Sequence, residues 1–113
     1  MPNPVVRFEI GCRDSAKARA FFGAIFDWNI ESAGPGLRID TGEAVGGGIT
    51  SLGHEPHQYT MFYVEVASIV ATLEAVERLG GKKIVGPVPL PTGQFAWFAD
   101  PEGNTIGLWQ KAG

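Results

Sequence analysis

The chain is poor in the residues on which several large classes of function depend. It has one cysteine in 113 residues, Cys12, so no internal disulfide can form and a reducing, cytoplasmic compartment is expected. Lysine and arginine number 9 against 12 aspartates and glutamates, and a net charge of -3 argues against a nucleic-acid-binding protein. No apolar run approaches the roughly 18 residues of a membrane span, and the amino terminus lacks the pattern of a signal peptide. We therefore expect a soluble domain whose partners include neither nucleic acid nor membrane.

Histidine is equally scarce, with only His54 and His57. They lie three residues apart in a segment with glycine and proline, so their spacing specifies no metal geometry, and exposed surface histidines explain them better. Cys12 has no neighbouring histidine and ends an expected strand on its apolar side. A buried, unreactive thiol is therefore expected rather than a catalytic one.

Glycine and proline, in contrast, are abundant, with 16 and 8 residues that recur at regular intervals. This distribution indicates many short strands and tight turns. Residues 5–12 alternate between apolar and polar side chains as a half-buried strand does, and Asp14-Ser15 offers an N-cap for a helix reaching about residue 26. Strands are expected next at 28–32, 37–40 and 44–50, with Trp28 in the core. The core-facing stripe of the helix is predicted to be Ala16, Ala20, Phe21, Ala24 and Ile25, widened by Phe22 and Phe26.

The second half repeats this order. A strand at 59–66 precedes an N-cap at Ser68, a helix that ends at Gly80-Gly81, and strands at 83–88, 95–99 and 105–110. The expected fold class is α+β, with one domain over residues 1–113 built from two tandem βαβββ modules, about 5–50 and 59–110, joined by residues 51–58. The apolar stripe of the second helix is predicted to be Ile69, Leu73, Val76 and Leu79.

The most informative segment is Asp100-Pro101-Glu102-Gly103-Asn104, between two short apolar runs. Proline presets φ, glycine supplies a positive φ, and Asp100 can accept hydrogen bonds from amides two residues on, so the segment predicts a hairpin. A hairpin of this kind that closes a small domain resembles the vicinal oxygen chelate superfamily, which includes glyoxalase I, bleomycin resistance proteins and extradiol dioxygenases. The resemblance covers Val5 to Gln110. It implies an incomplete barrel around a concave cavity, with helices outside, and a homodimer.

The resemblance also implies four positions for metal ligands, usually His or Glu. In this sequence they fall on Arg7, on Met61, on Gly107 and within Gly46-Gly47-Gly48. Guanidinium has no lone pair to offer, a thioether is too soft for the usual metals of the family, and glycine has no side chain. We therefore expect no metal at these positions and no cofactor.

Strand alternation predicts which residues line the concave face instead. The absent side chain at Gly107 is expected to leave room for a flat ligand beside Trp109. Arg7 and Glu9 could also pair with each other or with Glu65. Trp97 and Trp109 could belong to the core or to a dimer interface instead of a binding site. The candidate ligand-binding residues are Arg7, Glu9, Met61, Tyr63, Trp97, Gly107 and Trp109.

Three functions are compatible with this pattern. The first is a binding protein for a small aromatic or amphipathic molecule. The second is a lyase, isomerase or dioxygenase of the glyoxalase kind with a rearranged metal site, for which Glu9, Glu65 and Glu43 are the available carboxylates. The third is a non-catalytic assembly or regulatory module. The sequence favours them in this order.

Overall fold

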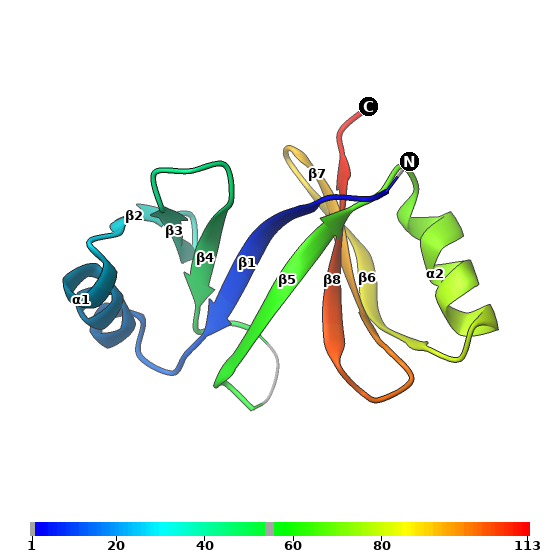
Figure 1. Ribbon diagram of the computed structural model, residues 1–113, viewed down its shortest axis with the longest axis horizontal. Helices are drawn as coiled ribbons and strands as arrows, with labels where there is room; N and C mark the ends of the chain where they lie inside the picture. The colour runs from blue at the N-terminus through cyan, green and yellow to red at the C-terminus, as the bar shows by residue number, and fades with distance from the viewer. Residues whose placement is uncertain (1, 54–55) are drawn as a thin grey trace. The chain divides into compact units, whose positions relative to one another are not determined.

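The computed structural model describes residues 2–53 and 56–113, and the same order of elements occurs in both halves (Figure 1). The first half contains β1 (Val5–Gly11), α1 (Ser15–Phe26), β2 (Asn29–Ala33), β3 (Gly36–Asp40) and β4 (Gly46–Thr50). The second contains β5 (Tyr59–Glu65), α2 (Ile69–Arg78), β6 (Lys82–Leu90), β7 (Gly93–Ala99) and β8 (Thr105–Lys111). The predicted α+β fold with two βαβββ repeats is confirmed.

The chain divides into two compact units. The N-terminal unit is Val6–Met61, and the C-terminal unit combines the segment that ends at Val5 with Phe62–Gly113. The strand order is β2-β3-β4-β1 in the first and β6-β7-β8-β5 in the second, so each module arranges its strands in the same way. The first and last strands of each module pair in parallel, and the other pairs are antiparallel. A cavity shared by both modules stays a prediction.

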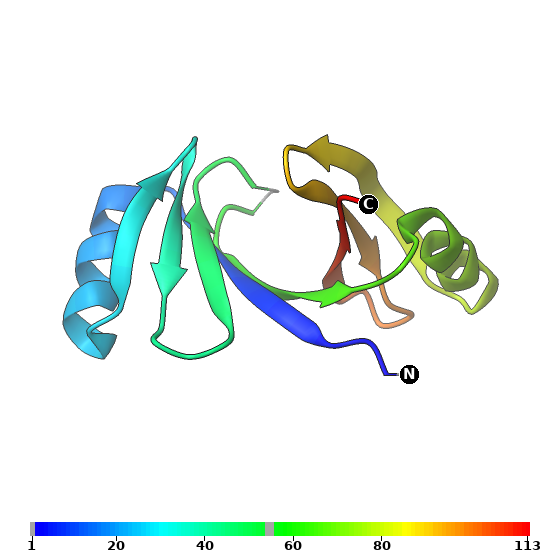
Figure 2. The same cartoon turned by 90° about the horizontal axis from the view of Figure 1, so that it is seen from above.

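The core of the N-terminal unit forms on the face of the sheet that α1 covers (Figure 2). Ile30, Ile39 and Ile49 are almost completely buried there, and Ala18 and Phe22 pack against them from the helix. Trp28 packs against the same cluster, as predicted.

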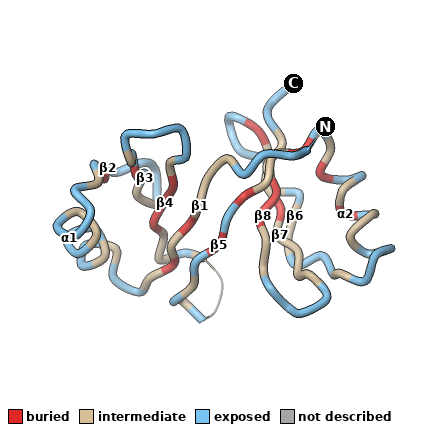
Figure 3. Tube along the Cα trace, viewed as in Figure 1, coloured by how far each residue is buried: buried red, intermediate tan, exposed pale blue. Residues whose placement is uncertain are grey.

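The predicted core stripe of α1 is wrong except for Phe22, which packs against the core as predicted. No residue of α1 is buried, and the helix carries no buried segment in Figure 3. Phe21 and Ile25 are 60% and 58% exposed. The helix has apolar residues on two sides, and Ala18 and Phe22, one turn apart, supply the side that packs on the sheet. The stripe at Ala16, Ala20, Phe21, Ala24 and Ile25 faces solvent instead, and Phe26 is 53% exposed.

Both helices begin at the predicted caps. The side chain of Asp14 accepts a hydrogen bond from Lys17 N at 3.1 Å, and Ser68 Oγ accepts one from Ala71 N at 3.1 Å. At the end of α2, Gly80 has a φ of +99° and Gly81 N donates to Val76 O at 2.8 Å.

The core of the C-terminal unit lies under α2. It consists of Val66, Ile69, Leu73, Ala96 and Leu108. Leu79, predicted to belong to the buried stripe, is 75% exposed because it forms the C-cap after the helix has ended at Arg78. Neither helix in the described part of the chain is long and apolar enough to cross a membrane.

Candidate functional site

The β7–β8 hairpin fixes which side chains share a face of the C-terminal sheet. In its turn, Asp100 Oδ1 accepts hydrogen bonds from Glu102 N at 2.9 Å and from Asn104 N at 2.8 Å, and Asn104 Nδ2 donates to Asp100 Oδ2 at 2.8 Å. The hydrogen bonds from Asn104 are the main reason that the pKa of Asp100 lies below its usual value. The turn closes the hairpin in a register that pairs Trp97 with Gly107 and Phe95 with Trp109.

These four residues lie on the face of the sheet opposite α2. Their neighbours along the strands, Ala96 and Leu108, belong to the core beneath the helix, and successive side chains of a strand point to opposite faces. Tyr63 of β5 lies on this same face, opposite α2, because it pairs in register with Gly107 of β8. The predicted sharing of one face by Tyr63, Trp97, Gly107 and Trp109 therefore agrees with the strand register.

The space above Gly107 is filled by the ring of Tyr63. A Cβ atom added at residue 107 would overlap that ring, which is 4% exposed. Trp97 Nε1 donates a hydrogen bond to Tyr63 Oη at 2.8 Å and so fixes the two rings relative to each other. The expectation that Gly107 leaves room for a ligand is wrong, because the chain's own tyrosine occupies that room.

Phe95 extends this arrangement along β7. Its ring centroid lies 6.0 Å from that of Trp97 and 6.5 Å from that of Tyr63, the latter at an interplanar angle of 79°. The indole of Trp109 lies over Gly93, where an added Cβ would come within 2.8 Å of it. We call Tyr63, Phe95, Trp97 and Trp109 the aromatic face; all but the buried Tyr63 are half-buried. Phe95 was not among the candidate ligand-binding residues, although its spacing of two from Trp97 places it on the same side of the strand.

In the N-terminal unit, a buried carboxylate lies on the side of the sheet away from α1. Glu9 is 9% exposed, and Tyr59 Oη donates a hydrogen bond to Glu9 Oε2 at 2.5 Å. The ring of Tyr59 lies where a side chain at Gly11 or Gly53 would project, so glycine at both positions makes room for it. Tyr59 was not among the candidate ligand-binding residues.

Arg7 and Met61 complete the candidates in that unit. The guanidinium of Arg7 lies over β4, where a Cβ added at Gly48 would be 2.7 Å from Arg7 Nη2. Met61, on β5, is 6% exposed. Glu65, a predicted partner of Arg7 or Glu9, has its carboxylate 3.6 Å from Lys111 Nζ in the C-terminal unit.

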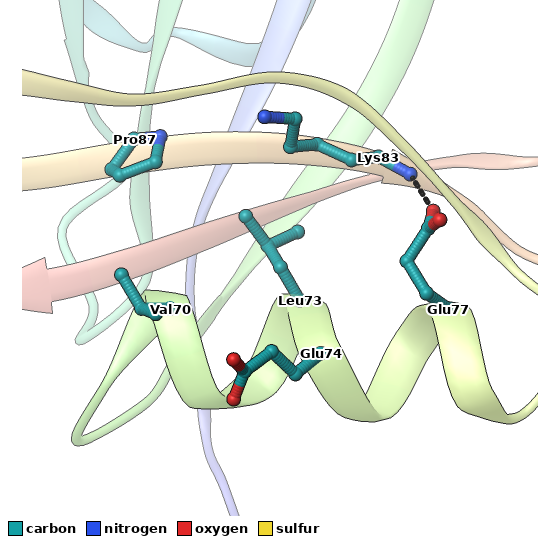
Figure 4. A pocket seen from close by; sticks show the side chains of 6 residues that line it. All are labelled: Val70, Leu73, Glu74, Glu77, Lys83 and Pro87. Atoms are coloured by element: carbon teal, nitrogen blue, oxygen red, sulfur yellow. Dashed lines mark hydrogen bonds between the residues drawn. The ribbon is translucent and has the colours of Figure 1, made fainter.

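A separate pocket of about 420 Å³ opens on the α2 side of the C-terminal sheet (Figure 4). Val70 and Leu73 project from the helix towards β6, and Glu77 Oε2 accepts a hydrogen bond from Lys83 N at 2.8 Å. Carboxylates and an ammonium together give this pocket no single charge that would select a ligand. Its lining residues are Val70, Leu73, Glu74, Glu77, Lys83 and Pro87.

Comparison with known proteins agrees with this fold. No family model matches the sequence. A glyoxylase-like domain-containing protein from Didymella fabae is 29% identical over 120 aligned residues, which cover 93% of this chain and 91% of that protein. A hypothetical protein from Bacillus halodurans superposes with a TM-score of 0.74 at 15% identity, over 100% of this chain and 97% of its own.

Two further solved structures are similar over most of their length. A glyoxalase/bleomycin resistance protein/dioxygenase superfamily member from Vibrio splendidus has a TM-score of 0.68 at 15% identity, over 98% of this chain and 100% of its own. Methylmalonyl-CoA epimerase from Mycobacterium tuberculosis has a TM-score of 0.68 at 12% identity, over 96% and 88%. The chain therefore has the fold of the vicinal oxygen chelate superfamily and is similar in sequence to a glyoxylase-like domain protein.

Two of the positions at which the family resemblance implies metal ligands have other groups beside them. The ring of Tyr63 lies over Gly107, and over Gly48 lies the guanidinium of Arg7, which has no lone pair to donate. Two of the carboxylates proposed for a rearranged metal site do not lie together as ligands. Glu65 lies beside Lys111, and Glu43 is exposed.

Within residues 2–53 and 56–113, no three His, Cys, Asp or Glu side chains group in a way that could hold a metal ion. His54 lies outside the described residues. His57 is half-buried in the segment before β5.

Proposed function

We propose that this protein, which has the fold of the vicinal oxygen chelate superfamily, binds a small planar aromatic or amphipathic molecule and does so without a metal. The observation that carries the proposal is the Tyr63 ring over Gly107, held by the indole of Trp97. The ring and the indole together form a fixed aromatic surface at the position where the family resemblance implies a carboxylate ligand. Apolar walls with few polar groups are typical of sites for small organic ligands.

The ligand would contact the half-buried members of the aromatic face, Phe95, Trp97 and Trp109, while the buried Tyr63 holds Trp97 in place. Such a surface is rigid before the ligand arrives, which lowers the entropic cost of binding. Arg7, Glu9 and Met61 stay predicted ligand contacts of the N-terminal unit.

Tryptophan fluorescence tests the proposal, because two of the three tryptophans, Trp97 and Trp109, belong to the aromatic face and Trp28 does not. Titration with a panel of planar aromatic compounds is expected to give saturable quenching for at least one of them. Replacing Trp97 or Trp109 by Phe is expected to weaken binding about three- to tenfold, the value of one aromatic contact.

Trp28→Phe is the matched control, and it should leave both the affinity and most of the quenching unchanged. Tyr63→Phe removes only the hydroxyl that Trp97 contacts and should weaken binding of the same compound. A panel that produces neither quenching nor a thermal shift, or equal quenching in all three tryptophan variants, would refute the proposal.

A second candidate, an enzyme that moves a proton, is favoured by Glu9. A carboxylate that is 9% exposed and held by the hydroxyl of Tyr59 at 2.5 Å has a fixed position, as a general base requires. Glu9→Gln keeps the shape and should abolish turnover while the ligand still binds. Glu31→Gln, at an exposed carboxylate on β2, is the control and should retain turnover. Turnover that survives in Glu9→Gln would contradict this candidate.

A further inference from the structure

An ion pair lies on the same side of the C-terminal sheet as the aromatic face. Val64 packs against the core beneath α2, so Glu65, its neighbour on β5, points to the opposite side. Gln110 Oε1 accepts a hydrogen bond from Ile69 N of α2 at 2.8 Å, so Lys111, its neighbour on β8, also points away from the helix. The two charges meet there, with Glu65 Oε2 at 3.6 Å from Lys111 Nζ.

The strand register places this carboxylate beside a tryptophan of the aromatic face. Glu65 pairs with Trp109 across β5 and β8, and Trp109 pairs with Phe95 across β8 and β7. Neighbouring strands of a sheet lie about 4.8 Å apart. A substituent on a ring that stacks on Trp109 can therefore reach the carboxylate of Glu65.

Glu65 is the more constrained member of the ion pair. Its side chain is 28% exposed, against 70% for Lys111, which is the last residue of β8. The backbone of Glu65 is held as well, since Glu65 N donates to Pro4 O at 2.9 Å and Asn3 Nδ2 donates to Glu65 O at 3.1 Å. An ion pair with one exposed partner contributes little to stability, so a cation from a ligand can replace the ammonium at small cost.

The aromatic rings decide which charge a ligand carries at this place. The face of an indole or phenyl ring is electronegative, so it attracts a cation and not an anion. Glu65 adds a negative charge beside the same surface. A planar cation is therefore favoured both by the rings and by the carboxylate. A planar anion would gain only the exposed ammonium of Lys111 and would lie near Glu65.

On the basis of the proposed function, we propose further that the ligand of the aromatic face is a planar aromatic cation. Its ring lies on Trp109 and Phe95. Its positive group, an ammonium attached to the ring system, takes the place of the Lys111 ammonium beside Glu65. The aromatic face thus supplies the affinity for the ring, and Glu65 selects the charge.

Titrations with matched sets of compounds test the charge. Each set is one planar ring system that carries an ammonium, a hydroxyl or a carboxylate substituent, and tryptophan fluorescence gives the affinities. The ammonium compound is expected to bind the wild-type protein at least about tenfold more tightly than the hydroxyl compound, and the carboxylate compound most weakly. Equal affinities within a set, or tightest binding of the carboxylate compound, would overturn the charge alone. Sets of which no member binds would refute the proposed function and the charge with it.

Glu65→Gln locates the preference, because it keeps the shape of the side chain and removes its charge. The hydroxyl compound should bind this variant as it binds the wild-type protein, which also shows that the site is intact. The advantage of the ammonium compound should fall to about threefold or less, the part that the rings provide. Glu102→Gln is the matched control, since it changes the net charge equally at an exposed residue, and it should keep the full advantage.

Lys111→Met tests the same contact without altering Glu65. Removing the competing ammonium should tighten binding of the ammonium compound about two- to threefold and leave binding of the hydroxyl compound unchanged. Weaker binding of the ammonium compound in Lys111→Met would overturn the proposal. So would an advantage that survives in Glu65→Gln or that is lost equally in Glu102→Gln.

Discussion

At the scale of the residue, Gly107 determines what the site can be. Replacing it by Ala would push a Cβ atom into the ring of Tyr63, which is 4% exposed and has little room to move. We expect Gly107→Ala to lower the free energy of unfolding by about 1–3 kcal/mol, the usual cost of overpacking. In a Tyr63→Ala background the same change should cost much less. Urea denaturation of the four proteins in this cycle measures the coupling.

Gly23 is the matched control for that experiment. It lies inside α1, where an added Cβ would have Trp28 O at 3.9 Å as its nearest neighbour. Gly23→Ala should therefore raise stability by about 0.5–1 kcal/mol, because alanine favours a helix. Equal destabilisation at both positions would mean that the Tyr63 ring does not fill the space above Gly107.

A residue-scale prediction also concerns the thiol. Cys12 Sγ lies 3.6 Å from Thr50 O, and burial, with a smaller contribution from Asp14, raises the pKa of Cys12. The thiolate is the reactive form, so Cys12 should react with iodoacetamide at about pH 8 more slowly than free glutathione does. After unfolding in urea the two rates should converge. Cys12 is half-buried rather than fully buried as predicted, and native Cys12 reacting as fast as glutathione would contradict the raised pKa.

At the scale of the element, the Asp100 turn links pH to the stability of the β7–β8 hairpin. Because the pKa of Asp100 is lowered in the folded chain, the associated stabilisation is present above the carboxyl's unfolded pKa of about 3.9 and is lost as pH falls through the folded pKa. Asn104→Ala removes the side-chain donor to Asp100 Oδ2. Its melting temperature should lie below that of the wild-type protein at about pH 7, and the difference should shrink in acid.

Glu102→Ala is the control, since Glu102 contributes a backbone N–H rather than its side chain to the turn. It should leave the acid dependence of the melting temperature unchanged. A difference between Asn104→Ala and the wild-type protein that is the same in acid and at neutral pH would contradict the assigned cause of the shift.

Helix caps and tight turns are the features of this fold that local sequence patterns predict correctly. The caps at Asp14 and Ser68 and the Asp100 turn depend on residues a few positions apart, and all three were predicted. The core side of α1 was not, because spacing cannot decide between two apolar sides of one helix. The Tyr63 ring over Gly107 was also beyond prediction, since it depends on the register between β5 and β8, strands far apart in sequence.

At the scale of the whole molecule, the start of the chain belongs to the unit made mostly of its end. The segment that ends at Val5 groups with Phe62–Gly113, although the rest of β1 belongs to the N-terminal unit. Two hydrogen bonds hold it there: Glu65 N donates to Pro4 O at 2.9 Å, and Asn3 Nδ2 donates to Glu65 O at 3.1 Å. The two units share the βαβββ order, but only the C-terminal unit includes a segment from the other end of the chain.

Deleting residues 2–4 should therefore destabilise the C-terminal unit at a defined place. We expect a loss of about 1–2 kcal/mol, since a net hydrogen bond contributes about 1 kcal/mol. Asn3→Ala, which removes only the exposed side-chain bond, should cost less. Hydrogen exchange locates the effect: the amide of Glu65 should exchange faster in the deletion variant but not in Asn3→Ala, because only the deletion removes its acceptor at Pro4. An unchanged exchange rate at Glu65 would show that the amino-terminal segment does not hold β5.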